Sequence, residues 1–296
     1  MINNITRNEL SSDIDDLAQF ASEGWFCCGF YSARDLLYMA LLVKQANTKY
    51  PQLNLYFVDE TEKLYALLSH IIADGAESAR VIVNIGEGGI HFAALDYAII
   101  DQKKSVILFE PTNFVCVQRG LLNRVNDIIC EINSRSKSVD RCCFTAVEMD
   151  IQRSDSDCGM FSLAIAKKLY RKSSYLEKMH RANLKGTLLV HTPELDRVYE
   201  YSSTYELGFL PPQEADKHLP VSFYKHVQGR RRLEEYLKLN PAARNEIINK
   251  KGETIVERLE KNLAKDRFGK NISISISRKR ISEYRNILRV MGGVES

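Results

Sequence analysis

Three apolar segments within residues 80–110 constrain the fold of this chain more than any other feature. They read RVIVNI, HFAALDYAII and SVILFE, and only the short polar segments GEGG and DQKK separate them. Apolar runs of this length, rich in β-branched and aromatic residues and bounded by turn-forming residues, predict β-strands. We therefore expect three strands, of which the second and third form a hairpin with a two-residue turn at Asp101 and Gln102.

Helical and strand patterns alternate on both sides of this block. Before it, Ser32 and Asp35 resemble a capping box that opens a helix ending before Pro51, NLYFV predicts a short strand, and TEKLYALLSHIIADG predicts a helix closed by Gly75. After it, apolar residues at 121, 125, 128 and 132 have the helical period, and CCFTAVEMDI predicts another strand. The next predicted helix begins at Cys158.

The composition is that of a soluble globular protein. Hydrophobic residues make up 45% of the 296 residues and charged residues 27%. No apolar run approaches the roughly 18 residues that cross a bilayer, and the first 24 residues lack the apolar core of a signal peptide. The seven cysteines are an odd number and show no CxxC spacing, so we expect reduced thiols in a cytosolic setting and no metal site.

The charge is distributed unevenly along the chain. The formal net charge is +3, but the segment from Leu219 onward holds 18 Lys/Arg against 9 Asp/Glu, so it carries +9 and the rest carries −6. Residues 186–220 are polar and contain prolines, which indicates a linking segment. The basic remainder shows mainly helical patterns, with NISISIS alternating as a strand would. A basic end on an acidic body suggests an anionic partner for the C-terminal segment.

Cys158 lies where a hydroxyl-rich loop meets an apolar helical run, in MDIQRSDSDCGMFSLAIAKKL. Phe161, Ile165 and Leu169 share one helical face with Cys158, so that face is expected to be buried and only the first turn to reach a cleft. A free cysteine is usually a small buried hydrophobe. At a helix N-terminus, however, the partial positive charge of the backbone N–H groups favours the thiolate, which is the nucleophilic form.

A base and a group that orients it are found in the predicted hairpin. With a two-residue turn, Glu110 lies opposite Ala93, two residues from His91 and on the same face of the sheet. Any even-length turn preserves this parity, and a change of one residue would break it. Gln152, six residues before Cys158, could join the Cys158 backbone N–H in stabilising an oxyanion. Each of these residues has an ordinary structural alternative, and their combination favours a catalytic site.

The order His91, Glu110, Gln152, Cys158, with QRSDSDCGMFSLA around the cysteine, resembles the YopJ family of type III secreted effectors. GEGGIHFAALDY, SVILFEPTNF, VEMDIQRS, LPVSFYKHVQG and SRKRISEYRNILRV extend the similarity over nearly the whole chain. The resemblance implies an α+β, Ulp1-like cysteine-protease fold, with a central mixed β-sheet flanked by helices and a mainly helical basic regulatory region. It also implies an N-terminal helical segment (1–50) contributing to the regulatory face, a catalytic core (51–185), the linking segment (186–220) and the regulatory region (221–296).

Residue by residue, the resemblance implies that His91 is the base, Glu110 its orienter, Cys158 the nucleophile and Gln152 an oxyanion donor. The regulatory region would bind inositol hexakisphosphate, a densely anionic ligand that favours clustered Lys and Arg. The candidate contacts are Arg230, Arg231, Arg232, Lys250, Lys251, Arg278, Lys279 and Arg280. Lys225 is similar to a lysine that is autoacetylated in relatives. The stretch GWFCCGFYSARDLLYM departs from the relatives at CCG and LLYM, which makes Arg34 a weaker candidate contact.

The implied function is acetyl transfer from acetyl-CoA, through an acetyl-cysteine, to Ser/Thr or Lys of host kinases such as MAP kinase kinases. The protein would be secreted by a type III system and act in the host cell cytoplasm. A protease of ubiquitin or ubiquitin-like proteins is the alternative, because it uses the same triad. A non-catalytic anion- or nucleic-acid-binding protein fits less well, because the basic runs lack the interleaved aromatic residues of a single-strand binder.

Overall fold

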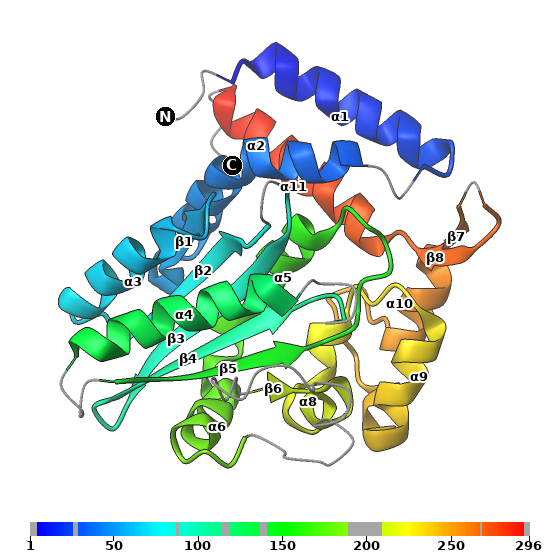
Figure 1. Cartoon of the computed structure of the whole chain (residues 1–296). Helices are drawn as coiled ribbons and strands as arrows, with labels where there is room; N and C mark the ends of the chain where they lie inside the picture. The colour runs from blue at the N-terminus through cyan, green and yellow to red at the C-terminus, as the bar shows by residue number, and fades with distance from the viewer. Residues whose placement is uncertain are drawn as a thin grey trace.

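A six-stranded mixed sheet forms the centre of the molecule (Figure 1). The computed structural model describes residues 5–25, 29–86, 89–113, 119–136, 141–188, 209–266 and 268–292. The strands follow one another in chain order across the sheet: β1 (Leu55–Val58), β2 (Ser78–Asn84), β3 (Phe92–Ile100), β4 (Lys103–Glu110), β5 (Cys142–Glu148) and β6 (Phe209–Leu210). β2, β3 and β4 are antiparallel, whereas β1, β5 and β6 pair in parallel with their neighbours. The α+β class and the strands expected before Cys158 are confirmed.

The β3–β4 hairpin has the register that the sequence predicts. Ile100 pairs with Lys103 and Ala94 with Phe109, so Glu110 follows opposite Ala93. Asp101 and Gln102 form the turn, with φ of 49° and 63°. Two consecutive positive φ values are typical of the tight turns whose twist matches that of paired strands. The hairpin therefore brings Glu110 and His91 to the same face and the same end of the sheet.

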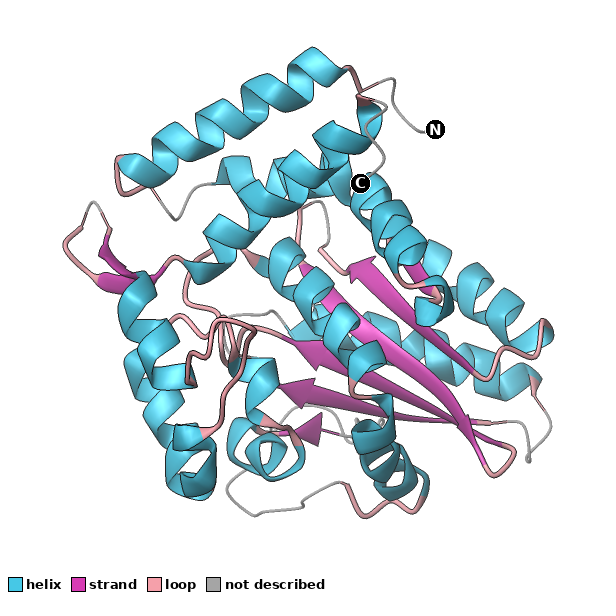
Figure 2. Ribbon diagram, turned by 180° about the vertical axis from the view of Figure 1, so that it is seen from behind, coloured by secondary structure: helices cyan, strands magenta, loops and turns pink. Residues whose placement is uncertain are grey.

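Helices cover both faces of the sheet. α3 (Lys63–Ala73) and α4 (Arg119–Arg135) lie in front of it in Figure 1, and their apolar residues pack against Val81, Leu95 and Leu108 of the strands. α2 (Gly29–Lys49), α5 (Cys158–Arg171) and α6 (Ser173–Leu184) lie on the opposite side, which faces the viewer in Figure 2. Successive side chains of a strand point to opposite sides of the sheet, so each strand contributes residues to both faces.

The C-terminal part of the chain folds beside the sheet and returns to its N-terminal helices. Its elements are α8 (Pro212–His218), η3 (Val221–Tyr224), α9 (Arg230–Leu239), η4 (Pro241–Asn245), α10 (Ile255–Asn262), β7 (Leu263–Lys265), β8 (Asn271–Ser273) and α11 (Ser275–Met291). α11 packs against α1 (Arg7–Ser22), α2 and α5 (Figure 1). Helices from the two ends of the described chain thus meet in space.

Three local expectations differ from the structure. Ser32 and Asp35 do not cap a helix: α2 already begins at Gly29, and Asp35 is buried in an ion pair with Arg280. Only three residues of NISISIS form a strand, because α11 begins at Ser275. Residues 209–218, expected in the linking segment, form β6 and α8, and Leu210 is fully buried. Within that segment, residues 189–208 lie outside the described residues.

No helix within the described residues is long and apolar enough to cross a membrane. In that same part of the chain, no group of three or more His, Cys, Asp or Glu side chains is arranged to hold a metal ion. Cys130, Cys142, Cys143 and Cys158 are free thiols.

Candidate active site

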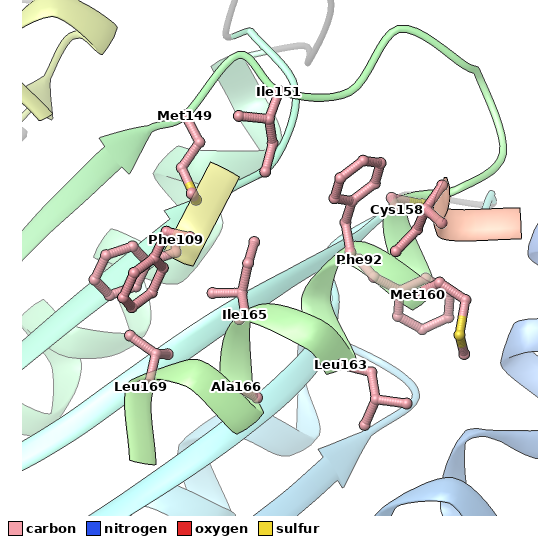
Figure 3. Close-up of a cluster of buried hydrophobic side chains, with 14 of the residues drawn as sticks. Phe92, Phe109, Met149, Ile151, Cys158, Met160, Leu163, Ile165, Ala166 and Leu169 are labelled. Carbon is pink, nitrogen blue, oxygen red and sulfur yellow. The ribbon is translucent and has the colours of Figure 1, made fainter. Parts of the chain in front are cut away.

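Cys158 is the first residue of α5, and its helix is anchored in the main core. Phe161, Ile165 and Leu169 are at most 2% exposed, and Cys158 itself is 1% exposed. Figure 3 shows Cys158 at the start of α5, in a buried cluster that includes Phe92 and Phe109 of the sheet. The expected helical face is confirmed. This packing fixes the position of the cysteine at the end of the sheet where the β3–β4 hairpin places His91.

His91 and Glu110 form a hydrogen-bonded ion pair. His91 Nε2 donates to Glu110 Oε2 at 2.9 Å. The other carboxylate oxygen, Oε1, accepts from the backbone N–H of Thr112 at 2.9 Å and from its hydroxyl at 2.8 Å. Glu110 is completely buried, whereas the His91 side chain remains 18% exposed. Since Nε2 is taken by Glu110, the nitrogen that can exchange a proton with Cys158 is Nδ1.

The surroundings of His91 favour its protonated form. Burial alone lowers the pKa of the imidazole, but the charge of Glu110 and hydrogen bonds to Cys158 and Glu110 outweigh burial. The pKa of His91 therefore lies well above its ordinary value. A histidine of this kind holds the proton that it takes from a thiol, which is the requirement for a cysteine nucleophile.

The loop before His91 is held by a buried asparagine and a glycine. Asn84 Oδ1 accepts from the backbone N–H of His91 at 2.9 Å and from that of Gly86 at 3.2 Å. A Cβ at Gly86 would lie 2.7 Å from the carbonyl oxygen of Gly89 and 2.9 Å from the His91 nitrogen, so only glycine fits. Part of GEGG, residues 87–88, lies outside the described residues. Asn84 and Gly86 thus fix the backbone position of His91.

Gln152 lies in the buried loop that leads into α5. Its Nε2 donates one amide hydrogen to the carbonyl oxygen of Ser154 at 2.6 Å. Gln228 holds the same loop from the C-terminal region, because its Oε1 accepts from the backbone N–H groups of Arg153 and Ser154 at 2.6 and 2.9 Å. The C-terminal region thus fixes the loop that carries Gln152 into α5.

A cavity of about 1010 Å³ lies between the C-terminal part of α2, α5, η3 and α11. We call it the basic pocket, after its cationic lining residues Lys44, Lys49, Lys167, Lys168, Arg171, Lys225, Lys279 and Arg289. His226 also lines it, together with the acidic residue Glu283, which pairs with Lys279 at 2.6 Å and Lys167 at 3.0 Å. The pocket therefore has a large excess of positive charge.

Crowding of these cations has an electrostatic cost. Burial, followed by repulsion from neighbouring cations, lowers the pKa of Lys168 and Lys225 to about 8. Burial also lowers the pKa of Lys167 to about 8, although Glu283 opposes the shift. The pKa of His226 falls well below its ordinary value through burial and the charges of Lys279 and Arg258. A bound polyanion would relieve this repulsion.

The expected activator contacts are divided between the pocket, the surface and the interior. Of the predicted set, Lys279 lines the basic pocket, and Lys225, predicted for another role, lines it too. Arg230 and Arg231 pair on the surface with Glu260 and Glu235. Lys251 is exposed, and Lys250 lies outside the pocket lining. Arg278 donates a hydrogen bond to Asn262, and Arg34 forms an ion pair with Asp13. Arg232 and Arg280 are buried.

Arg232 and Arg280 therefore do not fit the expected role of anion contacts. Arg232 pairs with Asp216, and Arg280 with both Asp35 and Asp157; each arginine is 1% exposed. Both guanidinium groups are buried and already paired with carboxylates, so they do not face a ligand in solution.

Sequence reasoning missed most of the pocket. Lys44, Lys49, Lys167, Lys168, Arg171 and Arg289 lie outside the basic C-terminal run or were not singled out within it. A signal existed in AKKLYRK at the end of the nucleophile's helix, where Lys167, Lys168 and Arg171 fall on one side at helical spacing. The partners from α2 could be found only from the fold.

Comparison with known proteins gives matches over nearly the whole chain. The model of a family described as YopJ Serine/Threonine acetyltransferase matches residues 10–286. A serine/threonine-protein acetyltransferase YopJ of Yersinia pestis is 42% identical over 291 residues, which cover 97% of this chain and 92% of the relative. A similar protein of Yersinia pseudotuberculosis is 41% identical over the same share of the chain.

Among solved structures, a deletion variant of AvrA with IP6 and CoA superposes with a TM-score of 0.84 and 39% identity, covering 96% of this chain and 99% of its own. HopZ1a in complex with IP6 and CoA superposes with a TM-score of 0.78 and covers 98% and 95%. At 20% identity, HopZ1a shows a shared fold.

Proposed function

Because the chain belongs to the YopJ serine/threonine acetyltransferase family, we propose that it transfers an acetyl group from acetyl-CoA to hydroxyl groups of host protein kinases through an acetyl-cysteine on Cys158. The observation that carries this proposal is the convergence of His91, Glu110 and Cys158 at one end of the sheet. The solved structure of AvrA, which is 39% identical to this chain, contains CoA, and this supports acetyl-CoA as the donor.

In the first half of the reaction, His91 Nδ1 takes the thiol proton and the Cys158 thiolate attacks the thioester carbonyl. The negative charge that develops on the carbonyl oxygen is stabilised by the backbone N–H of Cys158 and by the side-chain amide of Gln152. The tetrahedral intermediate collapses with cleavage of the carbon–sulfur bond to CoA. The leaving thiolate receives the proton from His91, and an acetyl-cysteine remains.

In the second half, a hydroxyl of the target protein attacks the acetyl-cysteine. His91 removes the hydroxyl proton as the new bond forms, and the same donors stabilise the second oxyanion. The thiolate of Cys158 leaves, and the protonated His91 restores the resting pair. Glu110 keeps the imidazole in one orientation and one tautomer through both halves, because its second oxygen is fixed by Thr112.

We further propose that inositol hexakisphosphate activates the enzyme by occupying the basic pocket. The pocket presents eight lysines and arginines to a ligand whose charge is equally dense. Its walls come from α2, α5 and α11, so an anion bound there would hold the nucleophile's helix against the N-terminal and C-terminal helices. Lys225, with its pKa lowered to about 8, is the lysine that we assign to autoacetylation, since an uncharged amine is the nucleophilic form.

The remaining parts of the proposal concern the setting. We assign MAP kinase kinases as targets, with acetylation of activation-loop Ser or Thr blocking their phosphorylation. We also assign secretion by a type III system and action in the host cell cytoplasm. Both follow from membership of the family.

The decisive experiment combines the protein with labelled acetyl-CoA and a MAP kinase kinase, with and without inositol hexakisphosphate. We expect acetyl groups on Ser or Thr of the kinase only when the phosphate ligand is present, and mass spectrometry locates them. The Cys158→Ala variant should bind the ligand with unchanged affinity and transfer no label. Cys142→Ala is the matched control, since Cys142 is an equally buried thiol far from the pair.

Two outcomes would refute this proposal. One is transfer by Cys158→Ala at the wild-type rate. The other is an absence of labelling together with cleavage of a ubiquitin-like substrate, which would identify a protease that uses the same triad.

A further inference from the structure

A buried ion cluster joins α11 to the residue that precedes the nucleophile. Arg280 donates to Asp35 through Nε and Nη2 at 2.8 and 2.9 Å, and to Asp157 through Nη1 at 2.7 Å. Nη2 also donates to the carbonyl oxygen of Ser156 at 3.1 Å. Arg280 is 1% exposed, and both aspartates are completely buried. One arginine thus bridges helix α2 and the entrance of α5.

Asp157 occupies the N-cap position of α5, yet its side chain does not cap the helix. An N-cap aspartate ordinarily accepts hydrogen bonds from the N–H groups of the first turn. Here the carboxylate makes no such bond. Its Oδ1 is held by Arg280, and its Oδ2 accepts from Ser154 Oγ at 2.5 Å and Gln228 Nε2 at 2.8 Å. Three partners from outside the helix therefore divert the carboxylate from the cap.

The glycine after the nucleophile is part of the same arrangement. A Cβ at Gly159 would lie 2.7 Å from the Cβ and from Oδ2 of Asp35. Gly159 φ is not in the left-handed range, so close approach, not backbone conformation, requires the glycine here. The cluster is thus packed directly against the first turn of α5.

We propose that Arg280 is a positioning residue for acyl transfer: it holds the Asp157 carboxylate away from the helix end and leaves the first N–H groups of α5 free for the oxyanion. A capping carboxylate would occupy these donors and place a negative charge beside the one that develops in the reaction. Arg280 prevents both, because it fixes the carboxylate and offsets its charge. The inference rests on the proposed acyl transfer at Cys158.

Two variants test this role, and neither leaves a charged side chain buried without an oppositely charged partner. Arg280→Lys keeps the charge but replaces the planar fork, which makes four hydrogen bonds here, with an ammonium that has three donors and no fixed fork geometry. Asp157→Asn replaces one acceptor oxygen by an NH2 group, so the side chain cannot accept from Arg280 on one side and from Ser154 and Gln228 on the other, and it is released to cap α5. The matched controls are Arg285→Lys, exposed on the same helix, and Asp155→Asn, exposed in the same loop.

Two reagents distinguish the reactivity of the Cys158 thiolate from the function of the oxyanion site. Iodoacetamide alkylates a thiolate by direct displacement and needs no oxyanion donors, whereas p-nitrophenyl acetate acylates Cys158 through a tetrahedral oxyanion and needs no CoA site. We expect both variants to lose about 10²-fold in the acylation rate, the effect of one lost oxyanion donor. The alkylation rate per folded site and its pH profile should stay within about threefold of wild type, as should all rates of the two controls.

Parallel loss of acylation and alkylation would overturn the proposal and assign the cluster a purely structural role. Unchanged acylation in Asp157→Asn would also overturn it. Failure of the proposed function has a different signature: the wild-type protein would accept acetyl from p-nitrophenyl acetate but not from acetyl-CoA, and the difference between variants and controls would persist.

Discussion

Glu110 has both carboxylate oxygens committed, one to His91 and one to Thr112. In Glu110→Gln, the amide group must face His91 Nε2 if the carbonyl oxygen keeps Thr112. The imidazole would then carry its proton on Nδ1 and could not accept one from Cys158. We expect turnover to fall by about 10²–10⁴-fold, the usual contribution of a positioned base.

The same substitution predicts a shift in the pH profile. Glu110 raises the pKa of His91, so its removal lowers that pKa, and the imidazolium is lost at a lower pH. The alkaline limb of CoA release against pH should therefore move to lower pH in Glu110→Gln. Glu131→Gln, on the exposed face of α4, is the control, and an unmoved alkaline limb would refute the orienting role of Glu110.

Gly86 gives a second prediction at the residue scale. A methyl group at Gly86 meets the backbone of Gly89 and His91, whereas one at Gly89 meets nothing within 4 Å. Gly86→Ala should destabilise the fold by about 1–3 kcal/mol, the usual cost of overpacking, and Gly89→Ala by much less. Urea unfolding measures the difference. Equal midpoints for the two variants would show that this loop does not depend on the close approach.

At the scale of elements, the end of α5 carries the most informative lysines. Lys168→Gln removes a charged contact to the proposed phosphate ligand, which is worth about 1.5–3 kcal/mol, or roughly tenfold to a hundredfold in affinity. Arg231→Gln is the comparison, because Arg231 is exposed on α9 and lies outside the pocket lining. Calorimetric titration with inositol hexakisphosphate should show the larger loss for Lys168→Gln, and the reverse order would move the site to α9.

Binding to these elements should also depend on pH. Lys167, Lys168 and Lys225 have pKa values of about 8 without ligand, and an anion favours their charged forms. Binding above pH 8 must therefore take up protons, and affinity should fall as pH rises through 8. Titrations in buffers of different ionisation enthalpy measure this uptake. Affinity that is constant from pH 7 to 9 would contradict the assignment of these lysines.

The elements also show why sequence reasoning succeeded for one part of the site and failed for another. His91 and Glu110 belong to one hairpin, where the alternation of side chains and the turn length determine which residues lie on the same face of the sheet. The sequence predicts Arg232 and Arg280 as contacts of an anionic ligand, because they belong to clusters of basic residues. Their carboxylate partners, Asp216 and Asp35, lie in other elements, and only the fold brings them together. Asp35 was likewise interpreted locally, as part of a cap.

At the scale of the whole molecule, α11 connects the first helices, the nucleophile and the basic pocket. A chain that ends at Ile274 would leave Asp35 and Asp157 buried without Arg280, and breaking such a pair costs about 3–5 kcal/mol. That is a large share of the stability of an ordinary domain. We expect this truncation to lower the urea midpoint strongly and to abolish acylation of Cys158. A chain ending at Gly292, which keeps α11, is the control; acylation within threefold of wild type in the shorter chain would contradict this prediction.

The contact between Arg280 and Asp35 spans 245 residues of sequence. On the ribosome, Cys158, His91 and Glu110 are all synthesised well before α11, so they precede the residue that keeps the α5 donors open. Contacts of such separation also form late in folding, because the intervening chain must be ordered first. The nascent protein therefore carries Cys158 before Arg280 can pair with Asp157, so the proposed acylation requires that α11 has been synthesised and folded. We expect Cys158 to gain reactivity toward acyl donors only after that step, which separates the time of production from the time of action.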